Sequence, residues 1–103
     1  MDRIEKLKLF LKDNPGDSFL KHALAMEYIK AGDDVMAENL LNQILSATPD
    51  YVGSYYQLGK LLERRGNNTA AIEVYIKGME LARAGGDNHT WNELRAAHEE
   101  LVF

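Results

Sequence analysis

The sequence repeats its main helix-breaking residues at a fixed interval of 34 residues. Pro49 follows Pro15 at this distance, and Gly66 follows Gly32. Apolar positions recur at the same interval, in the pairs Leu24 and Leu58, Ala37 and Ala71, and Leu11 and Leu45. A period of about 20–50 residues is typical of proteins that stack one small structural unit several times. The repeat therefore limits the chain to a fold built from similar neighbouring units.

Between these breaks the apolar residues are spaced by three and four, which predicts amphipathic helices. Strict alternation of apolar and polar residues never persists, so we expect no strands. The connections are short, which makes neighbouring helices antiparallel. The sequence thus predicts six antiparallel helices, over residues 2–13, 18–31, 34–47, 52–65, 69–83 and 88–101.

The residues between the predicted helices support these boundaries. Gly32 and Gly66 stand where a helix end favours a positive φ. Polar side chains that can cap the next helix follow each glycine, among them Asp33, Asp34, Asn67 and Asn68. The two prolines end the helices before them, and Asp17, Ser18 or Asp50 can cap the helices that come next.

Gly59 lies inside a predicted helix, where glycine costs about 1 kcal/mol relative to alanine. One repeat earlier its place is taken by Ala25, which is also small. Small residues allow two helices to approach closely while larger neighbours fill the space on either side. We therefore expect Gly59 to lie against the second helix of its own unit, and a larger side chain there to overpack the contact.

These residues resemble the tetratricopeptide repeat. The resemblance rests on the 34-residue period, on the pattern Leu-Ala/Gly-x-x-Tyr/Leu at Leu24 and Leu58, on Ala37 with Ala71, and on the closing Pro49. It covers nearly the whole chain and implies an all-α fold, an α-α superhelix or solenoid of about three repeats' worth of helices. The single domain 1–103 would hold a half unit 1–17, repeats 18–51 and 52–85, and a half unit 86–103. Two positions depart from the family pattern, Lys21 in place of an aromatic residue and Arg83 in place of a proline.

Composition excludes several classes of function. The chain has no cysteine, and its three histidines are too scattered for the spacing of paired ligands on a helix. The net charge of −4 argues against nucleic-acid binding, and no apolar run is long enough for a membrane span. No constellation of residues supports acid–base or nucleophilic catalysis. We therefore expect a cytoplasmic protein that is not an enzyme and that uses no cofactor and no metal.

The resemblance implies a scaffold that binds a peptide or protein segment in a concave groove lined by the first helix of each unit. Apolar residues at groove positions would otherwise face solvent, which favours a partner. An alternative is that another part of the chain folds over them. The groove positions carried over from the family include Lys30, Gly53, Glu63 and Ala96. The groove residues that we expect to bind the partner are Phe19, His22, Met26, Ile29, Tyr56, Lys60, Arg64, His89 and Asn92.

Two other functions remain open at the level of sequence. The half units at both ends could stack head to tail through apolar residues such as Leu7 and Leu94, which would give weak self-association. The chain could also be a non-catalytic accessory subunit. Trp91, the sole tryptophan, is expected to pack in the core against the last full unit, and Val35 to lie on the apolar side of its helix.

Overall fold

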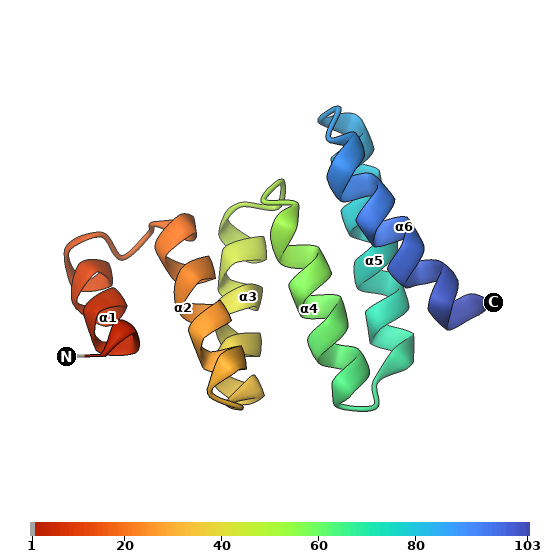
Figure 1. Ribbon diagram of the computed structural model, residues 1–103. Coiled ribbons are helices and arrows are strands. Elements are labelled where there is room, and N and C mark those ends of the chain that lie inside the picture. Colours follow the sequence, from red (N-terminus) through yellow and green to blue (C-terminus); the bar gives the residue numbers. More distant parts are fainter. Residues whose placement is uncertain (1) are drawn as a thin grey trace. The chain divides into compact units, whose positions relative to one another are not determined.

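A computed structural model describes residues 2–103. In this range the chain forms six α-helices and no strand (Figure 1). The predicted all-α class is confirmed, and every predicted helix end agrees with the structure to within one residue. The helices are α1 (Arg3–Asp13), α2 (Ser18–Lys30), α3 (Asp34–Ala47), α4 (Gly53–Arg64), α5 (Asn68–Ala84) and α6 (Asn88–Val102).

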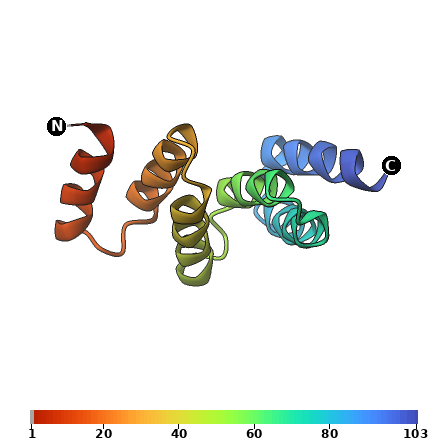
Figure 2. The ribbon, with the colours of Figure 1, turned by 90° about the horizontal axis from the view of Figure 1, so that it is seen from below.

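The helices group into two compact units, with the boundary between Thr48 and Pro49. The first unit holds α1 to α3, and its middle helix α2 packs against both of the others. The second unit holds α4 to α6, and each of these helices contacts the other two (Figure 2). Residue 1, the start of the predicted half unit 1–17, lies outside the described range.

Three helices end in glycine turns of the same type. Gly32, Gly66 and Gly86 have φ values of 82°, 79° and 73° and follow α2, α4 and α5. The residue after each glycine donates its backbone N–H to a carbonyl five positions back, as in the bond of 2.9 Å from Asp33 to Tyr28. That residue also caps the next helix through its side chain, which accepts from the backbone N–H three positions on. One three-residue turn thus ends one helix and starts the next.

The proline turns behave differently. α1 and α3 end two residues before Pro15 and Pro49, as proline requires. Asp17 caps α2 as predicted, but the expectation that Asp50 caps α4 is wrong, because α4 begins after Val52 without a side-chain cap. Instead the Ser54 N–H donates to the Tyr51 carbonyl at 3.1 Å. The α4 start is held further by the Tyr55 hydroxyl, which donates to the Pro49 carbonyl at 2.6 Å.

The core of each unit consists of the residues at the three- and four-residue spacing. Leu24, Ala25, Tyr28, Leu41 and Ile44 are buried in the first unit, and Tyr55, Leu58, Leu61, Tyr75 and Ala82 in the second. Val35 is 56% exposed, so its assignment to the apolar side of its helix is wrong. Val35 lies in the first turn of α3, where the chain has just left the Gly32 turn.

Leu7 and Leu94, which were expected to offer stackable faces at the two ends, are buried. Each lies on a helix that packs within its own unit, α1 on α2 and α6 on α5. The exposed apolar residues of α1 are Leu9 and Phe10 instead. At the other end of the chain, Val102 and Phe103 are exposed.

Two glycines bring the helices of the second unit together. A Cβ built on Gly59 of α4 would lie 2.1 Å from the Cε1 atom of Tyr75, whose ring comes from α5. A Cβ built on Gly78 of α5 would lie 2.6 Å from the Cβ atom of Tyr55 and 2.9 Å from the Cδ1 atom of Leu94. The close approach expected at Gly59 is confirmed, and it explains why glycine is kept inside a helix.

Candidate functional site

In the second unit, Lys60 is the centre of a group of polar and aromatic side chains on α4 and α6. Its Nζ atom lies 5.7 Å from the centre of the Tyr56 ring, within the range of a cation–π contact. The same atom lies 3.8 Å from Oε2 of Glu63 and 3.6 Å from Oε2 of Glu100. Its side chain is 30% exposed, so these contacts hold Lys60 in one place on the surface.

Tyr75 anchors this group from below. Its hydroxyl donates a hydrogen bond to Oε2 of Glu63, and the residue is fully buried. Burial and the adjacent Glu63 carboxylate both raise the pKa of Tyr75 far above that of a free tyrosine. The phenol therefore remains a hydrogen-bond donor throughout the neutral range. A chain of contacts thus runs from the core at Tyr75 through Glu63 and Lys60 to Tyr56 at the surface.

The two carboxylates on Lys60 are held very differently. The Glu63 side chain is 22% exposed and bonded to Tyr75, whereas the Glu100 side chain is 70% exposed. An exposed ion pair contributes about 0–1 kcal/mol, so little free energy opposes its exchange for another carboxylate. Glu100 is therefore the replaceable partner of Lys60, and Glu63 is the fixed one.

In the first unit the corresponding side of α2 is apolar and uncharged. One repeat apart, His22 takes the place of Tyr56, Met26 that of Lys60 and Ile29 that of Glu63. All three are half-buried, and burial lowers the pKa of His22, which favours its neutral form. Phe19, one turn before His22, is 70% exposed.

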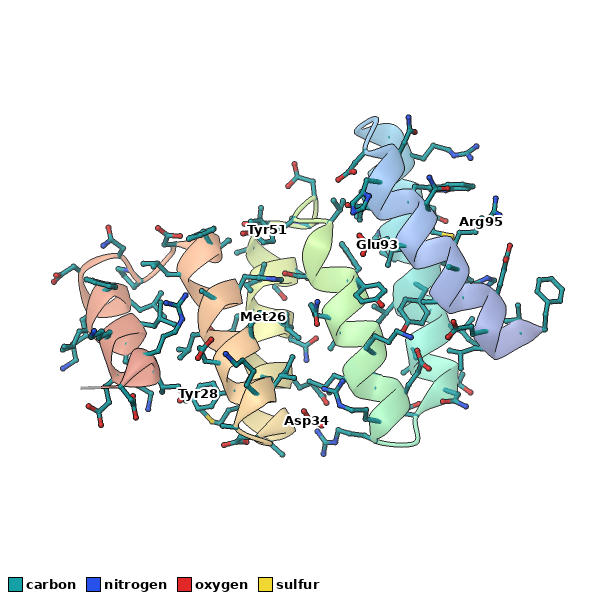
Figure 3. All side chains as sticks on the ribbon, in the orientation of Figure 1. Met26, Tyr28, Asp34, Tyr51, Glu93 and Arg95 are labelled. Carbon is teal, nitrogen blue, oxygen red and sulfur yellow. The ribbon has the colours of Figure 1, made fainter. Side chains whose placement is uncertain are left out.

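The two sides of α2 differ in chemistry. Met26 belongs to the apolar set of α2, which consists of Phe19, Met26 and Ile29. Tyr28, in contrast, is buried on the side of α1 (Figure 3). There Nζ of Lys8 lies 5.8 Å from the centre of the Tyr28 ring. The ion pair of 3.3 Å between Arg3 and Glu27 also joins α1 to α2. These contacts fix α2 on its α1 side and leave the apolar set on another side of the helix.

The remaining predicted residues of the second unit are exposed. Arg64 is exposed in the last turn of α4. His89 and Asn92 are exposed on α6, and Nε2 of His89 lies 3.3 Å from Oε1 of Glu93 in its own helix. Among the nine predicted groove residues, Tyr56 and Lys60 contact each other directly.

The structure adds two residues to the sequence-based set, Tyr75 and Glu100, and joins to it Glu63, which was among the carried-over groove positions. Glu63 lies three residues after Lys60 on one helix, so the spacing itself indicated a pair. Tyr75 and Glu100 lie on other helices, and no local pattern relates them to Lys60.

Within residues 2–103, no three histidine, aspartate or glutamate side chains converge as metal ligands would. The same range contains no helix that combines the length and apolarity needed to cross a bilayer. Every buried side-chain nitrogen and oxygen in this range has a hydrogen-bond partner.

Comparison with known proteins gives the family. The sequence profile described as tetratricopeptide repeat matches residues 52–84. The crystal structure of a tetratricopeptide repeat domain protein from Salinibacter ruber is 38% identical, with a TM-score of 0.81, over 84% of this chain and 96% of that one. The chain belongs to the tetratricopeptide repeat family.

Two further similarities differ in how much of each protein they cover. The solution structure of a protein from Bordetella parapertussis matches 99% of this chain and 89% of its own, with a TM-score of 0.85 and 24% identity, and so shows the fold alone. Human protein O-mannosyl-transferase TMTC3 is 35% identical over 65 residues, which are 63% of this chain. The match spans 7% of the length of that human protein.

In this tetratricopeptide repeat protein, the surroundings of Trp91 differ in part from those expected. Trp91 is half-buried, and its ring is flanked by two guanidinium groups, of Arg83 at 4.6 Å and of Arg95 at 5.4 Å. When Trp91 is aligned with Tyr55, Arg95 stands at the position of Gly59. Arg95 and Glu93 project from different sides of α6 (Figure 3). Trp91 therefore lies against α5 of the last full unit, as expected, but between two charged side chains and only half-buried.

Proposed function

We propose that this chain is a protein-interaction module whose second unit binds a partner segment through Tyr56 and Lys60. Tetratricopeptide repeats generally mediate contacts between proteins, and they do so through the surfaces that helix pairs present. The observation that carries the proposal is the anchored position of Lys60, held by Tyr56 and Glu63 while its third partner, Glu100, is exposed. A preorganised side chain loses little conformational freedom when it binds.

The same geometry favours a partner that carries an acidic side chain beside an apolar or aromatic one. A carboxylate of the partner would take the place of Glu100 on Lys60, and the neighbouring group would pack on the Tyr56 ring. In the first unit, the apolar set on α2, with Phe19, Met26 and Ile29, is a second candidate contact area of its own. This proposal assigns the chain no chemistry of its own.

The experiment uses a partner recovered by affinity capture with the full chain and then measured by isothermal titration calorimetry. Tyr56→Ala and Lys60→Met should each weaken binding by about tenfold or more, as removal of a central anchor does. Met26→Ala should weaken binding less. Ile76→Ala is the matched control, because Ile76 is an exposed apolar residue of α5 at 41% exposure.

Glu100→Gln makes the test sharper, because it removes the carboxylate that competes for Lys60. We expect this variant to bind the partner more tightly than the wild type. Unchanged affinity in Tyr56→Ala and Lys60→Met, or weaker binding in Glu100→Gln, would remove this surface from the function.

A further inference from the structure

The first unit contains a recess that is separate from the Tyr56 and Lys60 group of the second unit. It is a shallow recess open to solvent, with a volume of about 620 Å³, between α2 and α3. Lys21 of α2 and five residues of α3 line it: Asn39, Asn42, Gln43, Ser46 and Ala47. Lys21 stands at the position where the family has an aromatic residue and where the second unit has Tyr55.

The position of Lys21 along the recess follows from the antiparallel packing of the two helices. The hydroxyl groups of Ser18 and Thr48 lie 2.9 Å apart, so the start of α2 lies beside the end of α3. Lys21, three residues into α2, therefore lies near Gln43 and Ser46 rather than near Asn39. From Asn39 to Ser46 the helix rises about 10 Å, which is the length of about three residues of an extended chain.

The lining side chains are available for a ligand. In the part of the chain that the structure describes, no hydrogen bond or ion pair engages the side chains of Lys21, Asn39, Asn42, Gln43 or Ser46. A carboxamide carries both donors and an acceptor, as a peptide group does, so Asn and Gln can pair with a backbone. An amide also loses less free energy on desolvation than a charged group.

The second unit lacks this arrangement. One repeat later, the positions of Asn39, Asn42, Gln43 and Ser46 hold Glu73, Ile76, Lys77 and Glu80. An ordinary solvent-facing helix side carries such charges, whereas the α3 side is neutral. Lys21 is the one charged residue among those that line the recess, so it selects for a single negative group.

We propose that this recess binds an extended peptide segment of a protein partner. The carboxamides of Asn39, Asn42 and Gln43 pair with the backbone of about three residues. One aspartate or glutamate side chain of the segment reaches Lys21. The surface is distinct from the Tyr56 and Lys60 group and goes beyond the function proposed above.

Nuclear magnetic resonance of the isotope-labelled full chain tests this directly, with acetyl-Ala-Glu-Ala-amide as the probe. We expect saturable shifts of the side-chain NH₂ signals of Asn39, Asn42 and Gln43. The same peptide with glutamine in place of glutamate, or with methylated backbone nitrogens, should bind more weakly. The first control tests the contact with Lys21, and the second tests recognition of the backbone.

Variants complete the test. Lys21→Met and Asn42→Leu should each weaken binding of the peptide by about tenfold, the usual effect of losing one charge-assisted or buried hydrogen bond. Lys77→Met, which removes a lysine from an exposed position of α5, and Tyr56→Ala should leave binding unchanged. Shifts that map to Tyr56 and Lys60, no shifts at all, or equal binding by Lys21→Met would each overturn the proposal. If Tyr56→Ala weakens binding of the captured partner but leaves binding of the peptide unchanged, the proposal for the recess stands.

Discussion

In the first unit, Ala25 and Leu41 occupy the positions that Gly59 and Tyr75 occupy in the second. All four residues are buried. Tyr75 is larger than Leu41, whereas Gly59 is smaller than Ala25. The summed volume of the two residues therefore differs less between the units than the volume of either residue does. Cores tolerate such exchanges when total volume is kept. The comparison indicates that the fit of α2 on α3 and of α4 on α5 is preserved, and not the identity of the residues.

A third position changes together with these two. A buried tyrosine hydroxyl needs a partner, and the second unit provides one in Glu63. In the first unit Leu41 has no polar atom, and Ile29 stands where Glu63 would be. The choice of a large aromatic core residue in α5 therefore brings a carboxylate to the surface of α4, and with it the fixed position of Lys60.

The largest expected effect comes from breaking the fit in the second unit with Gly59→Ala. Alanine gains about 1 kcal/mol of helix propensity, but its Cβ would meet the fully buried Tyr75 ring. We expect a net loss of stability of about 2 kcal/mol, because overpacking this severe exceeds the gain. Urea unfolding followed by the fluorescence of Trp91, which lies in the same unit, measures it.

Gly53→Ala is the matched control on the same helix, since a Cβ there would meet no atom within 4 Å. It should leave stability unchanged or raise it by about 0.5 kcal/mol. Adding Tyr75→Leu to Gly59→Ala recreates the Ala25 and Leu41 pair, and the two changes should couple favourably by about 1 kcal/mol. If the losses of stability in Gly59→Ala and Tyr75→Leu simply add in the double variant, the two units do not follow one packing rule.

A smaller effect should appear at alkaline pH and belong to the second unit. The pKa of Tyr75 is raised in the folded state, above the value of about 10 for an unfolded tyrosine. The stability that this provides is present below about pH 10 and is lost as the pH rises further, because the unfolded chain then releases a proton that the folded chain keeps. Urea midpoints should fall more steeply above that pH in the wild type than in Tyr75→Phe.

In Tyr75→Phe the urea midpoint should still fall with rising pH, because burial and Asp50 also raise the pKa of Tyr55. Parallel midpoint profiles for wild type and Tyr75→Phe would contradict the account of Tyr75 as a buried donor to Glu63.

The smallest effect should appear at acidic pH and belong to the first unit. Burial lowers the pKa of His22, so its contribution to stability is present above about pH 6.5 and is lost as the pH falls. Stability of the wild type should therefore fall relative to His22→Gln on acidification. Amide hydrogen exchange along α2 checks this, and an unchanged difference between the two proteins would show that His22 is well solvated.

Where the helices begin and end could be predicted from the amino-acid sequence, because capping and turn formation are local. Gly32 and Gly66 adopt positive φ, and Asp17, Asp33 and Asn67 cap the helices that follow them. The sequence also indicated Tyr56 and Lys60, since a repeat fixes which positions share one side of a helix. Where the repeat weakens, at Trp91 in the last helix, the predicted contact with the last full unit is present, but the residue is half-buried and not part of the core.

Which residues act together across helices depends on how the helices pack against one another. Tyr75 reaches Glu63 because Gly59 has no side chain, and Glu100 reaches Lys60 because α6 packs against α4. The recess beside Lys21 likewise exists only where α2 and α3 meet. Such contacts depend on interhelical distance and rotation, which side-chain volumes set collectively, so no short stretch of sequence contains them.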